Sequence, residues 1–299
     1  MSNETPFPRI GIHYGATDIS MPVLDLAHAA AERGFESLVL PEHTHIPVSR
    51  STPYPTGEEM PDRYRRLLDP YIALSFVAAQ TGLAVGTCIS LVAQHDPVAL
   101  AKATATLDLL CGGRFFLGVG YGWNKEELAD HGVSFKDRRA VVREHVGLMR
   151  SLWQDTEAEF HGKHSTLERS WAWPKPVQQP SIPVLLGTSP SERAFGEVVE
   201  WADGWIPGGY DVVDILPGAL ASLRRRWFDE GRPEPGPLIY AMQGEIGRKE
   251  LRRRLECFHS LGVARVFLDL PSEPRDHVLP ILDSYADVLR NVPYAQLSG

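Results

Sequence analysis

Short apolar runs alternate with segments of helical period along almost the whole chain. The apolar runs hold few polar residues and end near glycine or proline, which is typical of buried β-strands. We expect strands at residues 9–15, 36–43, 83–90, 113–120, 182–188, 203–209, 237–247 and 264–271. Between them, apolar residues recur at helical spacing, as in helices that bury one face. The third helix, for example, repeats Leu100, Ala103, Leu107 and Leu110.

This alternation predicts the architecture. Near-continuously apolar strands are typical of a parallel sheet that is covered on both faces. Eight strand–helix units in 299 residues match a single (β/α)8 TIM barrel. A doubly wound open sheet alternates in the same way, but a count that closes at eight favours the barrel. No linker divides the chain, so we expect one domain over residues 1–299, with insertion loops Thr44–Leu68 and Asp155–Pro183 at the C-terminal face of the strands.

The composition is that of a packed globular protein without a basic surface. The chain has 43% hydrophobic and 23% charged residues and a net charge of −8. This acidic balance argues against nucleic acid and a membrane surface as partners, so we expect a small-molecule substrate. The three cysteines form no CxxC motif, the first residues show no signal-peptide pattern, and no apolar run reaches about 18 residues. We expect a cytoplasmic protein.

Chemically active residues gather where the expected strands end. In a TIM barrel the active site lies at this face, and the second strand runs directly into Glu42, His43 and His45. These residues fit a His-x-His metal pair, a histidine that caps strand backbone, or polar groups that face a bound heterocycle. A catalytic metal needs further ligands from later strands, and the ends of strands four to six offer no histidine. We therefore favour the heterocycle and expect no metal site.

Two further strand ends contain glycine. The "GVGYG" segment (118–122) follows the fourth strand and lacks the acidic partner of a dinucleotide-binding fingerprint about 20 residues on. Its glycines instead allow a tight turn or the close approach of a flat ligand. In "LLGTSPSERA" (185–194), hydroxyls stand at the start of a helix, where backbone N–H groups bind anions. The alternative is an ordinary N-cap by Ser189 or Ser191.

In this order, these segments resemble the luciferase-like flavin and deazaflavin oxidoreductases. The match rests on "GFESLVLPEH", "EFHGKH", "PKPVQQPSIPVLLGTSPSERAF", "ADGWIPGG" and, most specifically, "DPVALAKATATLDLLCGGRFFLGVG". It spans most of residues 9–210, whereas the tail matches only in its strand–helix rhythm. Within the family, the sequence is most similar to the actinobacterial subgroup assigned to coenzyme F420, an 8-hydroxy-5-deazaflavin.

The resemblance implies roles for individual residues. It places Glu42 and His43 against the cofactor ring, although the acid in the family is more often Asp. It also implies a non-proline cis peptide at Cys88–Ile89 and a cofactor phosphate on residues 187–189. The full expected cofactor-binding set is Glu42, His43, Cys88, Ile89, Gly120, Gly122, Asn124, Gly187, Thr188 and Ser189.

One position departs from the family pattern. Deazaflavin-dependent dehydrogenases that oxidise sugars or alcohols place a Glu a few residues after the strand-four glycines, where Trp123 stands here. The acid/base pair of that subclass would then be absent, which argues against sugar-phosphate dehydrogenase activity. We expect Trp123, Trp171 and Trp173 to wall the substrate pocket. His43 is the expected catalytic group for proton transfer, because imidazole has a pKa near neutrality.

The resemblance implies an oxidoreductase that transfers hydride between F420 and a small organic substrate. An FMN-dependent monooxygenase that uses reduced flavin and oxygen is the alternative within the family. Outside this class stand a metal-dependent barrel hydrolase and a flavin-binding protein without turnover. The family also implies a homodimer.

Overall fold

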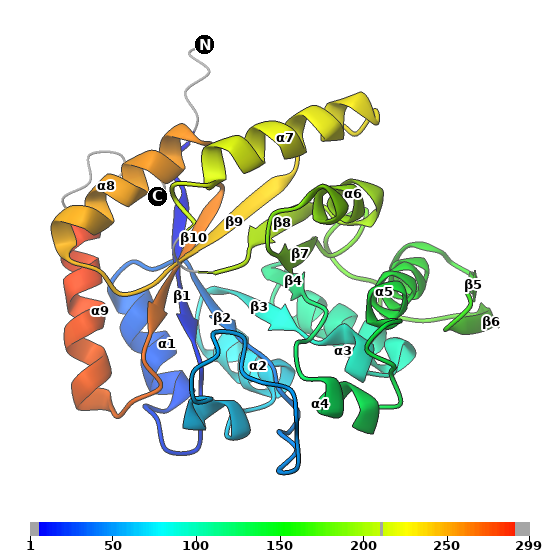
Figure 1. The fold of residues 1–299 in the computed structure, drawn as a ribbon, viewed down its shortest axis with the longest axis horizontal. Coiled ribbons are helices and arrows are strands. Elements are labelled where there is room, and N and C mark those ends of the chain that lie inside the picture. Colours follow the sequence, from blue (N-terminus) through cyan, green and yellow to red (C-terminus); the bar gives the residue numbers. More distant parts are fainter. Residues whose placement is uncertain (1–5, 210–211, 291–299) are drawn as a thin grey trace.

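A closed barrel of parallel strands forms the centre of the molecule (Figure 1). The structure is a computed structural model that describes residues 6–209 and 212–290. Around the barrel the strands follow the order β1-β10-β9-β8-β7-β4-β3-β2, and β1 closes it by pairing with both β2 and β10. The (β/α)8 prediction is confirmed, and the open-sheet alternative is wrong. The barrel strands are β1 (Arg9–Tyr14), β2 (Ser37–Leu40), β3 (Ala84–Ser90), β4 (Phe115–Val119), β7 (Val184–Thr188), β8 (Gly204–Pro207), β9 (Leu238–Gln243) and β10 (Arg265–Leu270).

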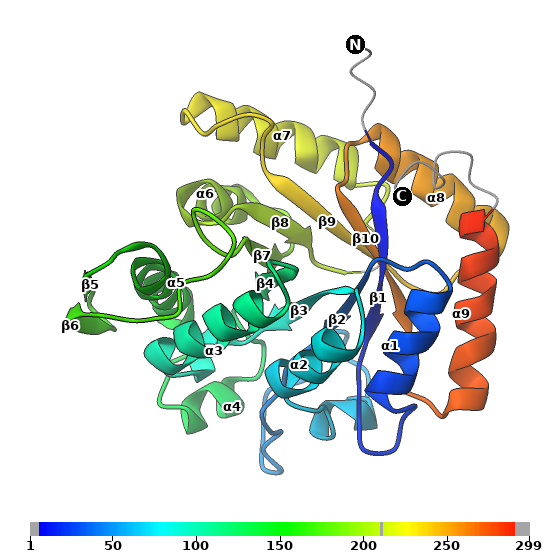
Figure 2. The ribbon, with the colours of Figure 1, turned by 180° about the vertical axis from the view of Figure 1, so that it is seen from behind.

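Helices surround this barrel, as the two opposite views in Figures 1 and 2 show. Two of them, α2 (Pro70–Gln80) and α3 (Pro97–Leu110), begin at a proline, and the preceding Asp69 and Asp96 accept hydrogen bonds from their first-turn amides. The helices are α1 (Val23–Glu32), α2 (Pro70–Gln80), α3 (Pro97–Leu110), α4 (Lys125–Asp130), α5 (Arg138–Gln154), α6 (Glu192–Trp201), α7 (Leu216–Asp229), α8 (Arg248–Ser260) and α9 (Arg275–Arg290). Among the described residues, none of these helices combines the length and apolarity needed to cross a bilayer.

Aromatic side chains fill the interior of the barrel. Phe116 stacks on Phe267 with ring centroids 5.9 Å apart, and Tyr240 meets Phe116 edge-on at 5.2 Å. Gly86 makes room for this cluster, since a Cβ there would lie 2.4 Å from the Phe116 ring. These rings pack across the barrel interior, and in TIM barrels ligands bind beyond such a layer, at the C-terminal ends of the strands.

The face that α3 buries differs from the one its apolar spacing predicts. Ala103 is exposed and Leu110 is 77% exposed, whereas the polar Thr104 and Asp108 are buried. These polar groups are satisfied: Thr104 donates to the carbonyl of Leu100, and Asp108 accepts from the backbone amides of residues 177 and 178. A buried polar group is tolerated when it is hydrogen-bonded. Apolar spacing alone was therefore right for Leu100 and Leu107, which are buried, and wrong for Ala103 and Leu110.

The connections contain elements that the sequence pattern did not indicate. The 155–183 segment, expected as a loop, includes an antiparallel hairpin of β5 (Ala158–His161) and β6 (Thr166–Ser170). Its Phe160 packs onto α5 opposite Gly147, where a Cβ would lie 2.9 Å from the ring. Short 3-10 helices, η1 (Asp62–Arg65) and η2 (Val92–Gln94), follow β2 and β3, and α4 follows β4.

Candidate active site

A cavity of about 450 Å³ opens at the C-terminal ends of the barrel strands, and we call it the barrel cavity. Its volume falls in the usual range for small-molecule sites. Of the residues expected at the site, it includes Glu42, His43, Cys88, Ile89, Gly122, Trp123, Gly187, Thr188 and Ser189. The rest of its wall is formed by His13, Gly15, Pro41, Arg63, Tyr64, Leu67, Leu91, Tyr121 and Met242. Segments far apart in sequence meet here because parallel strands bring their carboxyl ends to one face.

His43 is held between a carboxylate and an indole. Its Nδ1 lies 2.7 Å from Oε2 of Glu127, and its Nε2 lies 3.2 Å from Nε1 of Trp123. Indole N–H only donates, so Nε2 of His43 accepts, and the ring proton sits on Nδ1, where it is donated to Glu127. His43 is therefore a neutral imidazole with a basic nitrogen directed at Trp123.

Asn124 and α4 position the carboxylate of Glu127. Asn124 is buried and caps α4 by accepting from the amide of Glu127 at 3.4 Å. The second carboxylate oxygen of Glu127 accepts from the amide of Thr44 at 3.3 Å. The loop after β2 is thus fastened to α4 at two adjacent residues. Glu127, four residues after Trp123, supplies a carboxylate to His43 from the first turn of α4. Sequence analysis did not single out this carboxylate.

Glu42 has a different partner set. Its carboxylate accepts from Ser90 Oγ at 2.7 Å, from the Leu91 amide at 2.6 Å and from His95 Nε2 at 2.7 Å. Burial raises the pKa of Glu42, but these hydrogen bonds and the charge of His95 outweigh burial and leave the pKa lowered. Burial lowers the pKa of His95, and Glu42 more than reverses that effect. Glu42 therefore lies at the cavity wall as an ionised group that ties the ends of β2 and β3 together.

The end of β3 forms one wall of the barrel cavity. The Cys88–Ile89 peptide bond is cis, as the resemblance implied. Ile89 lies against Gly120 and Gly187, where added Cβ atoms would stand 1.7 Å and 2.5 Å from its side chain. Burial, with Asp269 nearby, raises the pKa of the Cys88 thiol to about 12, so Cys88 is a neutral wall residue and not a nucleophile.

The start of α6 lies beside Ser189, one of the residues expected to hold a phosphate. Ser191 caps the helix by accepting from the Ala194 amide at 3.1 Å, so Ser189 is not needed as the cap. Gly208 faces Ser189, and a Cβ at that position would lie 3.0 Å from the Ser189 nitrogen and 3.1 Å from its hydroxyl. The absence of a side chain at residue 208 therefore leaves the amide and hydroxyl of Ser189 accessible beside a helix N-terminus, which suits a phosphate group.

A second histidine that lines the barrel cavity, His13, is also paired with a carboxylate. His13 Nδ1 lies 2.5 Å from Oδ1 of Asp269, and its Nε2 lies 3.2 Å from the carbonyl oxygen of Cys88. A carbonyl only accepts, so the Nε2 contact is a hydrogen bond that His13 donates to Cys88. Sequence analysis did not single out this pair.

Four expected site residues lie outside the barrel cavity. Gly120 faces Ile89, and Asn124 caps α4, so neither lines the cavity. Trp171 and Trp173 are 75% and 61% exposed, beyond β6, and Lys102 of α3 donates to the Trp173 backbone carbonyl. The 155–183 segment turns outward as a hairpin, so its tryptophans are not walls of this cavity.

A metal centre is not formed by the histidines after β2. His45 turns to the surface, where its Nε2 lies 2.9 Å from Asp130, away from His43. Within residues 6–209 and 212–290, no three His, Cys, Asp or Glu side chains are grouped as metal ligands.

Comparison with known proteins places the chain in a family. The sequence profile of luciferase-like monooxygenases matches residues 9–244. The chain belongs to the luciferase-like monooxygenase family. An uncharacterized protein of Mycobacterium tuberculosis is similar to it, with 39% identity over 283 residues that cover 92% of this chain and 98% of the relative. As a member of this family, the chain is an oxidoreductase.

Solved structures show the luciferase-like fold at lower sequence identity. The monooxygenase RslO1 from Streptomyces bottropensis has a TM-score of 0.77 at 18% identity, covering 94% of this chain and 98% of that one. An F420-dependent secondary alcohol dehydrogenase, solved with an F420–acetone adduct, has a TM-score of 0.74 at 16% identity, covering 97% and 99%. At such identities the likeness is one of fold.

Sequence reasoning missed several residues of this luciferase-like site. Asn124 followed by Glu126 and Glu127 is a recognisable helix start, so α4 could have been found. Which of the two acids faces His43 is set only by the direction of the helix. His13 and Asp269 each lie one residue before the end of a strand, which is a signal that was present in the chain but not used.

Proposed function

We propose that this luciferase-like oxidoreductase binds coenzyme F420 in the barrel cavity and exchanges hydride with a small organic substrate. The observation that carries the proposal is the unprotonated Nε2 of His43, held at the cavity by Glu127 and Trp123. Hydride transfer to a carbonyl, or from an alcohol, must be matched by proton transfer at the substrate oxygen. We assign the uptake or release of that proton to Nε2 of His43.

The chain's own residues fit such a cofactor. Gly187, Thr188 and Ser189 offer backbone and hydroxyl donors for a phosphate beside the α6 N-terminus. Cys88 and Ile89 supply an apolar wall against which a flat ring can rest. When bound, the deazaflavin would supply hydride transfer at its C5, and the protein would supply orientation and the exclusion of water.

The proton step is assigned to His43. In the alcohol-oxidising direction, Nε2 would exchange its hydrogen bond from Trp123 for one from the substrate hydroxyl and take up its proton. Glu127 would then stabilise the imidazolium through the Nδ1–H bond that it already accepts at 2.7 Å. This is the arrangement in which an oriented base is supported by a buried carboxylate. In the reducing direction the same proton would return to the substrate oxygen.

FMN is the competing cofactor, because the family includes monooxygenases. A side-by-side fluorescence titration of the full-length protein with F420 and with FMN separates the two. Tight F420 binding with weak FMN binding supports the proposal. The reverse result would replace it with a monooxygenase that uses reduced FMN and oxygen. Binding of neither molecule would overturn the cofactor assignment altogether.

We also propose that the protein acts as a homodimer through α2. The exposed side of this helix carries Ile72 and Phe76, which remain 64% and 59% exposed. Large apolar side chains gathered on a surface mark a protein–protein contact, and a second copy of the chain is the simplest partner. Light scattering after size-exclusion chromatography should show a dimer that Phe76→Glu dissociates; a monomeric wild-type protein would contradict this proposal.

A further inference from the structure

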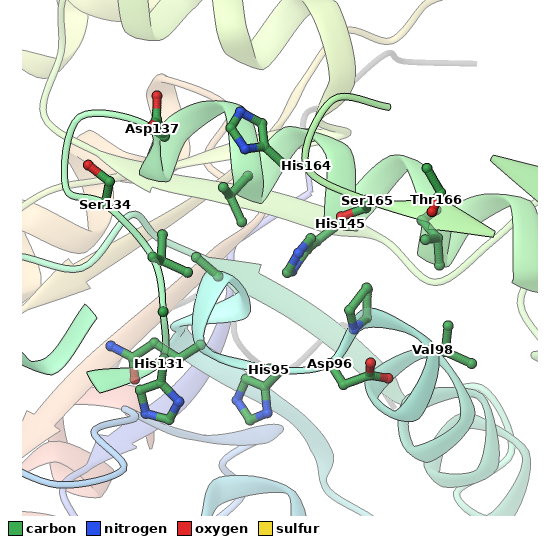
Figure 3. A pocket seen from close by; sticks show the side chains of 17 residues that line it. His95, Asp96, Val98, His131, Ser134, Asp137, His145, His164, Ser165 and Thr166 are labelled. Carbon is green, nitrogen blue, oxygen red and sulfur yellow. The ribbon is translucent and has the colours of Figure 1, made fainter. Parts of the chain in front are cut away.

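A second and larger cavity, of about 600 Å³, lies beside the barrel, and we call it the lateral cavity. It is bounded by η2, the start of α3, the α4–α5 connection, α5 and the turn between β5 and β6. Figure 3 shows His145 extending from α5 between two groups of side chains. His95, His131 and Asp96 lie on one side, and Ser134, His164 and Ser165 lie on the other.

The two cavities share no lining residue, but they share a wall. Glu42 lines the barrel cavity and His95 lines the lateral cavity, and their side chains meet at 2.7 Å. Thr44 also connects the two sides of this wall. Its amide donates to Glu127, which contacts His43, and its hydroxyl lies 2.8 Å from His131, which lines the lateral cavity. The lateral cavity is therefore a separate space behind the loop that carries His43.

His145 presents a hydrogen-bond acceptor to the lateral cavity. The residue is only 7% exposed, and its Nδ1 lies 3.1 Å from the carbonyl oxygen of Val92, so Nδ1 carries the proton. Burial lowers the pKa of His145, which keeps the ring neutral near pH 7 and its Nε2 unprotonated. No described residue donates to that nitrogen. A ligand in the lateral cavity that carries an O–H group could donate to this nitrogen.

Gln94, by contrast, has a hydrogen-bond donor that lacks an acceptor. The residue is also 7% exposed and lines the lateral cavity, and its carboxamide oxygen accepts from the Thr44 hydroxyl at 3.4 Å. Its amide Nε2 is buried and has no acceptor among the described residues. Asp96 adds an acceptor, because only one of its carboxylate oxygens is used in capping α3. Ser134, Ser165 and Thr166 add hydroxyls that both donate and accept.

We propose that the lateral cavity binds a neutral polyhydroxylated molecule, such as a sugar or polyol. Hydroxyl groups donate and accept at once, so one ligand can donate to His145 Nε2 and, once the Gln94 side chain turns toward the cavity, accept from its buried Nε2. An oxyanion offers no donor to His145 and would face the carboxylates of Asp96 and Asp137. An alkylammonium ion offers no acceptor to Gln94. Val98, Val133 and Leu148 give the cavity an apolar strip that suits the C–H face of a sugar ring.

The test uses the full-length protein without added cofactor, so it does not depend on the proposed redox function. D-glucose, myo-inositol and glycerol serve as polyol probes, with inorganic phosphate and methylammonium as charged probes. Saturation-transfer NMR and calorimetry should show saturable binding of at least one polyol and weaker binding of both ions. His145→Leu should weaken polyol binding about fivefold, the usual effect of one lost hydrogen bond.

Two further variants locate the site and guard against misfolding. Ser134→Trp blocks the cavity from an exposed rim position without touching the core, and it should abolish polyol binding. Trp123→Ala enlarges the barrel cavity and should leave polyol affinity unchanged. The proposal is overturned if no polyol binds saturably, if Ser134→Trp binds like the wild type, or if phosphate or methylammonium binds more tightly than every polyol.

Discussion

Nδ1 of His43 lies 2.7 Å from Oε2 of Glu127, although 84 residues separate them in the chain. The carboxylate is fully buried, and the imidazole lies between it and the barrel cavity. Glu127 therefore acts on the proposed chemistry through His43 and is a positioning residue. The pair is the centre of the site, and it makes the role of His43 testable without replacing the histidine itself.

Replacing Glu127 should lower turnover without loss of cofactor. In Glu127→Gln the side chain keeps its size but loses the charge that stabilises protonated His43, so we expect kcat to fall about 100-fold, at the lower end of what acid–base groups contribute. The pH profile of kcat should also move, because His43 loses an anionic partner. Steady-state kinetics across pH, with cofactor affinity measured in parallel, test this expectation.

Glu126→Gln is the matched control for that experiment. Glu126 lies on the same turn of α4, but its carboxylate accepts from Ser51 and does not contact His43. The kcat and the pH profile of the Glu126→Gln variant should remain those of the wild type. Equal turnover in the two variants would remove His43 and Glu127 from the proton-transfer step.

A charge at residue 189 should weaken cofactor binding. Ser189→Asp places a carboxylate where we assign the cofactor phosphate, and two like charges about 4 Å apart repel by roughly 1 kcal/mol or more. We expect the dissociation constant to rise about tenfold. Ser189→Asn is the control, because it has the same size and shape without the charge. If the Asp and Asn variants bind the cofactor equally well, the phosphate lies elsewhere.

Adding one methyl group at residue 120 should disturb the cavity wall. In Gly120→Ala the new Cβ would stand 1.7 Å from Ile89 Cδ1, so Ile89 must move into the space where the cofactor ring is proposed. We expect weaker cofactor binding and a loss of about 1–3 kcal/mol in stability, as is usual for overpacking. In the control Gly82→Ala the new Cβ meets nothing within 4 Å, so cofactor affinity and stability should both remain unchanged. Unchanged cofactor affinity in Gly120→Ala would place the ring away from Ile89.

The Glu42–His95 pair should stabilise the fold most strongly in mildly acidic solution. The pKa of His95 is raised above its ordinary 6.5, so its contribution is complete below that value and is lost as pH rises through the raised pKa. The pKa of Glu42 is lowered below its ordinary 4.5, so its contribution is complete above that value and is lost as pH falls through the lowered pKa. Both contributions are therefore complete between these two ordinary values.

Urea unfolding across pH tests this window. The difference in unfolding free energy between the wild type and His95→Gln should be largest between pH 4.5 and 6.5, and it should shrink on either side. His28→Gln, on the exposed face of α1, is the control and should show no such maximum. A difference that does not vary with pH would mean that His95 contributes by packing alone.

Much of the fold could be predicted from the sequence because its signals are local. Apolar strand runs, the Asp-Pro helix starts at residues 69–70 and 96–97, and the count of eight units all depend on neighbours in the chain. The same holds for the strand ends that carry His43 and residues 187–189, which the barrel brings to one mouth. Local signals also explain the errors: spacing alone placed Ala103 and Leu110 in the core and missed the β5–β6 hairpin.

The sequence by itself determined the barrel, the face that bears the cavity and the presence of a histidine there. Only the tertiary structure decided that Glu127 and not Glu126 supports His43, that Gly120 accommodates Ile89, and that Trp171 and Trp173 point away from the site. It also revealed the lateral cavity, whose walls come from three separate segments, residues 93–98, 131–148 and 164–166. Periodicity and capping act over a few residues, whereas these contacts depend on how closure of the barrel turns distant loops toward or away from one another.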